Sequence, residues 1–135
     1  MDDFVCPTYE HLVLVNQTLV ARYGGAGHHV RDGGPLHNAL HLVQGPIFGV
    51  DQFPTLVEKA CKIAHAIATG HVFTDGNKKT AASVLDLVLN LNGCALQVPQ
   101  DDLVEVMYRL ARNDLTIEEF VAWTRERLTG PAASF

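Results

Sequence analysis

The segment 77–92 most constrains the fold of this chain, because it predicts a helix that is apolar on nearly all of its faces. From Ala81 onward its polar residues are Ser83, Asp86, Asn90 and Asn92. Gly93 follows at the position where helices commonly end. A helix with so little polar surface has to be covered on most sides. We therefore expect it to lie at the centre of the fold.

Proline, glycine and capping residues divide the rest of the chain into five further predicted helices. We expect these helices at residues 7–22, 35–43, 54–69, 101–110 and 116–128. Asp101 is expected to cap the fifth of the six helices, and Thr116 with Glu119 has the spacing of a capping box for the sixth. Residues 45–53, with two glycines and a proline, predict a loop or a short hairpin. Residues 94–98 predict a short edge strand that ends at Pro99.

The length of 135 residues corresponds to one domain, and a hydrophobic content of 47% is sufficient for a packed core. No internal repeat and no linker divides the sequence. We expect one domain over residues 1–129 and a disordered tail at residues 130–135. The predicted fold class is all-α, a compact six-helix bundle with a central buried helix and room for one short hairpin or edge strand.

Charge and targeting signals exclude several classes of protein. The formal net charge is −5, which argues against a general nucleic-acid binder because phosphates require a basic face. The start has no basic segment followed by an apolar stretch, and no run approaches the length of a membrane span. Cys6, Cys61 and Cys94 are odd in number and far apart, which suits a reducing cytoplasm. We expect a cytoplasmic protein without direct nucleic-acid or membrane contact.

The segment GHVFTDGNKKT, residues 70–80, has the features of an anion site. Asp75 is a good N-cap for the following helix, and Gly76 with Asn77 can turn the chain so that backbone N–H groups point outward. Such groups at a helix start bind anions. The next two residues, both lysines, oppose the helix dipole at about 0.3–1 kcal/mol each. A bound polyphosphate would compensate for this cost.

The same segment also carries residues suited to a metal and to proton transfer. Asp75 can hold Mg²⁺, which prefers a carboxylate together with phosphate oxygens. His71 has the side chain suited to general-base work near neutral pH. Each of these residues also has a purely structural interpretation. His71 can be an ordinary loop histidine, Asp75 can serve as a cap only, and Lys78 and Lys79 can be solvated charges. Phe73 is expected to anchor the loop in the core.

The run HVFTDGNKKT resembles the signature of the Doc (death-on-curing) branch of the Fic/Doc family, H-x-F-x-D/N-x-N-K-R. The matching positions are His71, Phe73, Asp75, Asn77 and Lys78, and Lys79 stands where the branch usually has arginine. The longer Fic pattern, H-P-F-x-D/E-G-N-G-R-x-x-R, has glycine where this chain has a lysine. Two further stretches, ARYGG at residues 21–25 and VRDGGPLHNAL at residues 30–40, also look like the family.

The resemblance implies a helical core and a transfer onto a protein hydroxyl that depends on ATP and Mg²⁺. In the Doc branch the γ-phosphate passes to a threonine of elongation factor Tu, which blocks translation, and a cognate antitoxin neutralises the toxin. By this resemblance His71 is the general base and Asp75 the magnesium ligand. The implied ligands of the nucleotide phosphates are Gly76, Asn77, Lys78 and Lys79.

Two other functions remain open on the sequence: an AMP-transferring enzyme of the Fic type, and a catalytically weak antitoxin-binding module. The loop 45–53 occupies the position of the family's target-docking flap, although it can equally be a plain connector. His28, His29 and the pair His37 and His41 invite a metal site, but no nearby carboxylate or cysteine completes a ligand set.

Overall fold

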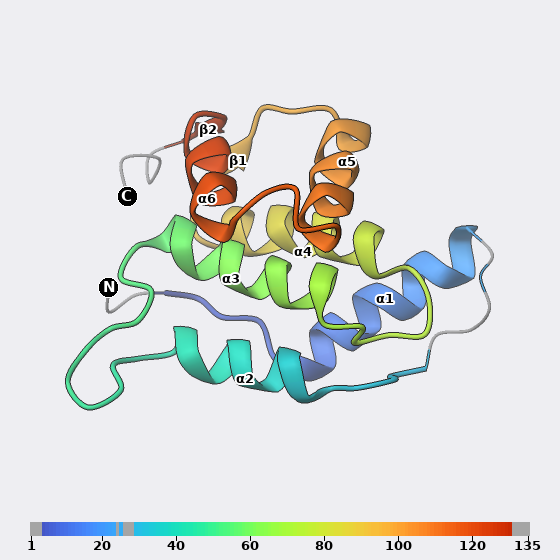
Figure 1. Cartoon of the computed structure of the whole chain (residues 1–135), viewed down its shortest axis with the longest axis horizontal. Coiled ribbons are helices and arrows are strands. Elements are labelled where there is room, and N and C mark those ends of the chain that lie inside the picture. The colour runs from blue at the N-terminus through green and yellow to red at the C-terminus, as the bar shows by residue number, and fades with distance from the viewer. Residues whose placement is uncertain (1–3, 24, 26–28, 131–135) are drawn as a thin grey trace.

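The structure is a computed structural model that describes residues 4–23, 25 and 29–130. Within these residues the chain forms six helices and one pair of short strands (Figure 1). The elements are α1 (Tyr9–Tyr23), α2 (Gly34–Val43), α3 (Leu56–Thr69), α4 (Asn77–Leu91), β1 (Ala95–Leu96), α5 (Gln100–Ala111), α6 (Ile117–Arg125) and β2 (Leu128–Thr129). The all-α prediction is confirmed. Residues 131–135 of the expected tail lie outside the described residues.

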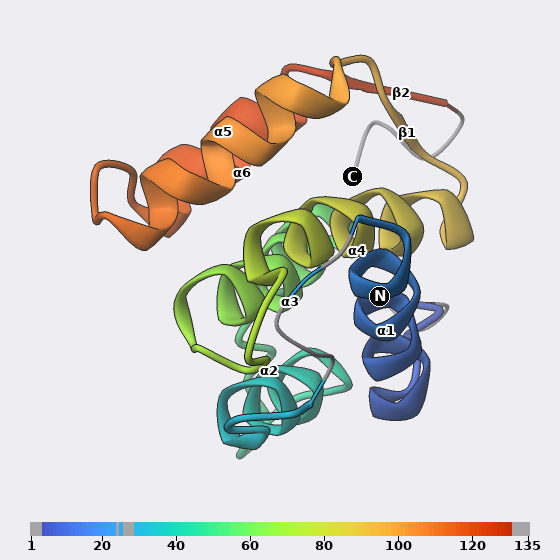
Figure 2. The same ribbon diagram turned by 90° about the vertical axis from the view of Figure 1, so that its right-hand side faces the viewer.

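The helices α3 and α4 form the middle layer of the bundle, with α1 and α2 on one side and α5 and α6 on the other (Figure 2). The expected central position of α4 is confirmed, since it packs against α1, α3, α5 and β1. It shares this position with α3, which contacts α2, α4, α5 and α6. Ten residues of α3 are buried, so both middle helices supply the core. No helix in the described part of the chain is long and apolar enough to cross a membrane.

The predicted edge strand is present as β1, and its partner strand corrects the expected end of the sixth helix. Helix α6 ends at Arg125 instead of continuing to Leu128. Leu128 pairs with Leu96 in antiparallel register, and the N–H of Gln97 donates to the carbonyl of Arg127 at 2.8 Å. The chain leaves the helix because its last residues complete this two-stranded sheet.

The helix starts confirm one predicted cap and correct another. Thr116 and Glu119 form the expected capping box of α6, with both reciprocal hydrogen bonds present. Asp101 does not cap α5, because this helix begins at Gln100 directly after Pro99. Asp101 instead lies in the first turn, where a carboxylate still favours the positive end of the helix dipole.

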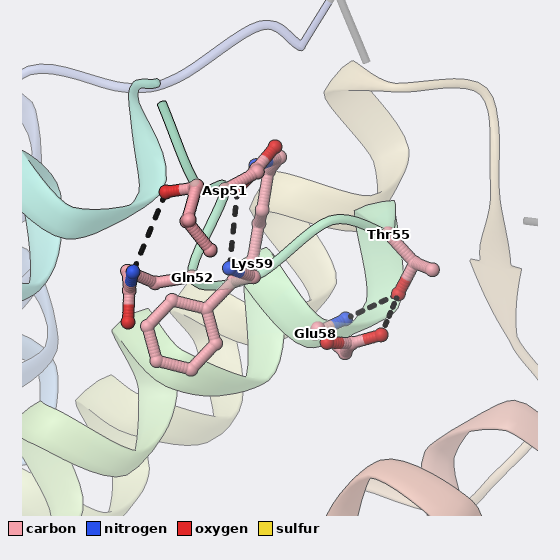
Figure 3. Close-up of polar contacts among 7 residues, drawn as sticks. Asp51, Gln52, Thr55, Glu58 and Lys59 are labelled. Atoms are coloured by element: carbon pink, nitrogen blue, oxygen red, sulfur yellow. Dashed lines mark hydrogen bonds and ion pairs between the residues drawn. The ribbon is translucent and has the colours of Figure 1, made fainter. Parts of the chain in front are cut away.

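Residues 45–53 contain a tight hairpin, in which Ile47 and Val50 exchange two backbone hydrogen bonds of 2.9 and 3.0 Å. The hairpin is joined to α3 by an ion pair between a buried lysine and a partly exposed aspartate: Lys59 Nζ lies 3.1 and 3.2 Å from the two carboxylate oxygens of Asp51 (Figure 3). Lys59 is 1% exposed and lies on the core face of α3 among apolar residues, although its side chain carries a charge. The sequence analysis did not single out this pair. Thr55 caps α3 beside it, accepting from the N–H of Glu58.

Candidate functional site

The loop between α3 and α4 starts at a close contact between helices. Gly70 follows the last turn of α3, and its N–H donates to the carbonyl of Ala66 at 2.9 Å. A Cβ at Gly70 would collide with that carbonyl and would lie 2.7 Å from Cβ of Pro35, in the first turn of α2. The absence of a side chain at Gly70 therefore allows the end of α3 to lie against the start of α2.

The loop continues as an extended segment that pairs with residues 29–32. The N–H of Arg31 donates to the carbonyl of Val72 at 2.7 Å, and the N–H of Thr74 donates to the carbonyl of His29 at 3.0 Å. Val72 and Phe73 are buried, so the expected core-anchor role of Phe73 is confirmed. The first half of the motif is thus fixed to the body of the protein.

The side chain of Asn77, the first residue of α4, holds the loop from the other end. Its Oδ1 accepts from the N–H of Phe73 at 3.0 Å, and its Nδ2 donates to the carbonyl of Phe73 at 2.9 Å. We expected this carboxamide to bind phosphate, whereas its two polar atoms both engage the loop backbone. The donors that are still available here for an anion are the second N–H of Asn77 Nδ2 and the N–H groups of the helix backbone.

The start of α4 differs from the expectation in the identity of its N-cap. The N-cap residue is Gly76, in the left-handed conformation with φ 75° and ψ 17°, so the prediction that Asp75 caps the helix is wrong. Asp75 Oδ1 instead accepts from the N–H of Gly76 at 2.8 Å. No side chain caps α4, and its first turn has no acidic residue. Its N-terminal N–H groups are consequently without the side-chain acceptor that a capped helix provides.

Helix α1 supports this turn through Asn16, which is fully buried. Asn16 Nδ2 donates to the carbonyl of Asp75 at 2.9 Å and to Thr80 Oγ1 at 3.0 Å. A Cβ at Gly76 would lie 3.3 Å from Asn16 Nδ2 and 3.3 Å from Val20 Cγ2. The motif turn therefore lies tightly against α1.

A cavity of about 430 Å³ opens at the N-terminus of α4, and five of the six predicted site residues line it. These five are Asp75, Gly76, Asn77, Lys78 and Lys79. The opposite walls come from α1 and its following residue Gly25, and from Tyr108 of α5. Two ammonium groups and one carboxylate thus surround a single opening, an arrangement suited to an anion of several charges.

The sixth predicted residue, His71, does not line the cavity but lies on the turn that precedes it. Its side chain is exposed, between the end of α3 and the buried pair Val72 and Phe73. Its φ of 50° is in the left-handed region, which is uncommon for residues other than glycine, although asparagine, aspartate and histidine adopt it more often than the rest. Such outliers cluster at functional sites. The imidazole of His71 is therefore exposed on a turn whose next two residues are buried.

Two tyrosines that the sequence analysis did not single out contact the motif lysines. Lys79 Nζ lies 4.3 Å from the ring centroid of Tyr23, and Lys78 Nζ lies 5.8 Å from that of Tyr108. Both distances are within the range of cation–π attraction. Tyr23 belongs to the family-like stretch ARYGG, which was a usable signal. No sequence signal connects Tyr108 with the motif, because the two are far apart in sequence.

The residues present fit Mg²⁺ only together with an anionic ligand. Asp75 lines the cavity, and the second oxygen of its carboxylate lies so close to Gly25 that any Cβ there would collide with it. No group of three histidines, cysteines or acidic residues that could hold a metal occurs in the described ranges. Mg²⁺ commonly binds through one or two carboxylates plus substrate phosphates, and one carboxylate beside an anion cradle meets that need.

The histidines considered for a separate metal site do not form one within the described ranges. The ring of His37 stacks on Tyr9, with centroids 3.8 Å apart. His28 lies outside the described residues.

Fold and site together define an α-helical protein with a cavity at the start of a central helix, lined by two lysines and one aspartate, and comparisons with known proteins show its family. The model of the family described as "Fic/DOC family" matches residues 6–89, which include the whole motif. The chain is 35% identical over 95 residues to "Toxin Doc" of Mycolicibacterium smegmatis, covering 69% of this chain and 73% of that protein. It is 28% identical over 123 residues to "Protein kinase doc" of Escherichia phage P1, covering 91% and 94%.

The chain belongs to the Fic/DOC family, and within it to the Doc branch. The family match ends at residue 89, whereas the similarity to the phage protein extends over most of the chain. The predicted resemblance is therefore confirmed.

Proposed function

We propose that this protein is the toxin of a toxin–antitoxin pair and that it transfers the γ-phosphate of ATP to a threonine hydroxyl of a target protein. The observation that carries the proposal is the convergence of Asp75, Gly76, Lys78 and Lys79 on one cavity at the uncapped start of α4. A triphosphate needs backbone donors and cations at one place, and this cavity offers both. The names of the two relatives, a toxin and a protein kinase, support the same reading.

The proposed reaction begins with His71, which accepts the proton of the threonine hydroxyl as the oxygen attacks phosphorus. The bond between this oxygen and the γ-phosphorus forms, the bond from phosphorus to the β–γ bridging oxygen breaks, and ADP leaves with the electron pair. His71 lies on the turn beside the cavity and is exposed, so a partner protein can approach it. General-base catalysis by a histidine typically contributes about 10²- to 10⁴-fold in rate.

The cavity residues stabilise charge in this proposal. The N–H groups of the first turn of α4, from Asn77 onward, hold phosphate oxygens at the positive end of the helix, while Gly76, whose own N–H donates to Asp75 Oδ1, shapes the turn that presents them. Lys78 and Lys79 neutralise the charge that develops on the transferred group and on the leaving oxygen. Asp75 holds Mg²⁺, which when bound neutralises part of the phosphate charge. The reaction therefore depends on electrostatics and position more than on covalent chemistry.

Membership of the Doc branch supports a proposal for the target and for the partner. We propose elongation factor Tu as the target, so that translation stops, and a cognate antitoxin as the inhibitor. Transfer of AMP remains the second candidate, because the same cavity would hold a triphosphate in either orientation. Lys78 disfavours it, since the Fic pattern has glycine at this position and a lysine would crowd the phosphate there.

Expression in a bacterium tests the toxin assignment. Induction of the wild type should stop growth, and γ-labelled ATP added to the lysate should label one protein beyond those labelled in a lysate without the toxin. His71→Ala should fold, permit growth and add no labelled protein to that background. Growth arrest without a γ-labelled product, together with a product labelled from α-labelled ATP, would favour AMP transfer. Neither growth arrest nor a labelled product would favour the antitoxin-binding module.

A further inference from the structure

One stripe of α1 supports the motif along its length. Asn16, Val20 and Tyr23 follow at intervals of four and three residues, so they share a helical face. Asn16 holds the carbonyl of Asp75, Val20 lies in the cavity wall, and Tyr23 lies beside Lys79. Asn16 and Val20 are buried and hold the motif turn against α1, whereas Tyr23 is 58% exposed.

The exposure of Tyr23 indicates that its ring does not serve the core. The ring lies at the mouth of the cavity, with the ammonium of Lys79 4.3 Å from its centroid. Lys79 is itself exposed, so neither side chain is held by packing on all sides. A lysine has a flexible stem and is a compact point charge, whereas an arginine presents a planar fork to phosphate. A lysine at this position needs another means of being held in place.

We propose that Tyr23 is a positioning residue, whose ring face fixes the ammonium of Lys79 at the cavity mouth where a nucleotide phosphate binds. This inference rests on the proposed function, because it assigns Lys79 to a phosphate. The attraction is electrostatic, between the cation and the negative face of the ring, and does not require the tyrosine hydroxyl. The attraction of Lys78 to Tyr108 is weaker, because that distance of 5.8 Å is close to the limit for such contacts.

A double-mutant cycle tests this coupling with a non-hydrolysable ATP analogue and Mg²⁺, measured by calorimetry. The proteins are the wild type, Tyr23→Phe, Tyr23→Leu, Lys79→Met and the double variant Tyr23→Leu with Lys79→Met. Tyr23→Phe retains the ring face and should bind like the wild type. Tyr23→Leu should weaken binding by about two- to fivefold. In the Lys79→Met background the same change should have no further effect.

Two results would overturn the inference while leaving the proposed function intact. One is an equal loss from Tyr23→Leu with and without Lys79, which would indicate that the ring acts on the nucleotide or the fold directly. The other is a Tyr23→Phe variant as weak as Tyr23→Leu, which would assign the effect to the hydroxyl.

A spectroscopic measurement separates the inference from the proposed function. The ring current of Tyr23 should shift the NMR signals of the Lys79 ε-methylene upfield in the free protein, and Tyr23→Leu should remove the shift. A wild type without this shift would overturn the inference even if nucleotide binds. A wild type with the shift but without nucleotide binding would contradict the proposed function, and the assignment of Lys79 to phosphate with it.

Discussion

The carboxamide of Asn77 pairs with the backbone of Phe73 through two hydrogen bonds, one donated and one accepted. This pair closes the motif loop on the first residue of α4. It places the buried Phe73 ring and the cavity-lining turn at Asp75 and Gly76 in one rigid unit. The asparagine of the motif therefore has a structural task that its position next to a phosphate site does not suggest.

Asn77→Ala should lower stability and not only activity, because it removes both bonds to Phe73. With a net value of about 0.5–1.5 kcal/mol for each bond, the free energy of unfolding should fall by about 1–3 kcal/mol. Urea denaturation followed by circular dichroism measures this. Asn77→Asp keeps the acceptor and loses the donor, so it should fall between the wild type and Asn77→Ala. An unchanged free energy of unfolding in Asn77→Ala would contradict a structural role of the pair.

Lys79→Arg should bind nucleotide more tightly, because the guanidinium offers two parallel donors to a phosphate while retaining attraction to the Tyr23 ring. One additional hydrogen bond with a net value of about 0.5–1.5 kcal/mol predicts an affinity about 2- to 10-fold higher. Calorimetric titration with the ATP analogue and Mg²⁺ provides the comparison. Lys79→Met is the matched control and should bind more weakly than the wild type. The idea fails if arginine gains neither affinity nor turnover.

Asp51→Asn should destabilise the protein, because the buried ammonium of Lys59 loses its carboxylate partner. Burial alone would raise the pKa of Asp51, but the hydrogen bonds from Lys59 and from the Phe53 N–H lower it below its usual value. The contribution of Asp51 is present above the usual aspartate pKa and is lost as pH falls through the lowered one. Thermal denaturation from pH 7 downward should show a larger loss of stability in the wild type than in Asp51→Asn, so that the gap between the two proteins narrows as pH falls.

A second variant separates the charge from the packing at this pair. Adding Lys59→Met to Asp51→Asn removes the unpaired charge and should recover part of the lost stability, since an apolar side chain suits the core face of α3. A double variant less stable than Asp51→Asn alone would indicate that the pair acts through shape and not through charge.

Asp86→Asn should stabilise the protein at neutral pH, because burial raises the pKa of this carboxyl and so disfavours its charged form. When folding raises the pKa of a carboxyl, the loss of stability that its charge causes is absent below the pKa of the unfolded chain. This loss grows as pH rises from that value to the pKa of the folded protein. The stability gap between variant and wild type should therefore be largest at pH 7 and narrow towards pH 4. Urea denaturation at several pH values tests this, and a gap independent of pH would refute the assignment.

The sequence predicted helix ends correctly where neighbouring residues alone determine them. The capping box of Thr116 and Glu119 requires only a spacing of three, and it is present as predicted. Helix α4 begins at Asn77, as predicted, so the N-cap position is occupied by Gly76, which has no side chain to cap with, and Asp75 lies one residue too early to cap it. The end of α6 depends on the pairing of Leu128 with Leu96, and no local pattern reports a partner so distant in sequence.

The candidate site shows the same division. The motif placed Asp75, Gly76, Asn77 and both lysines at one helix start, because they are consecutive. The tyrosines that contact the lysines come from α1 and α5, and only the packing of these helices against α4 brings them there. The burial of Lys59 could not be predicted, because a lysine is buried on an apolar helix face only when a partner such as Asp51 compensates its charge, and the sequence does not show that pairing.

The central claim is that the motif loop and the start of α4 form a site that transfers the γ-phosphate, with His71 as the base. The most direct test incubates purified protein with Mg²⁺, elongation factor Tu and ATP labelled at either the α or the γ position. His71→Asn is the matched control, since asparagine tolerates the left-handed backbone at this position. The account predicts transfer of the γ label alone by the wild type and none by the variant. Transfer of the α label, or equal transfer by His71→Asn, would contradict it.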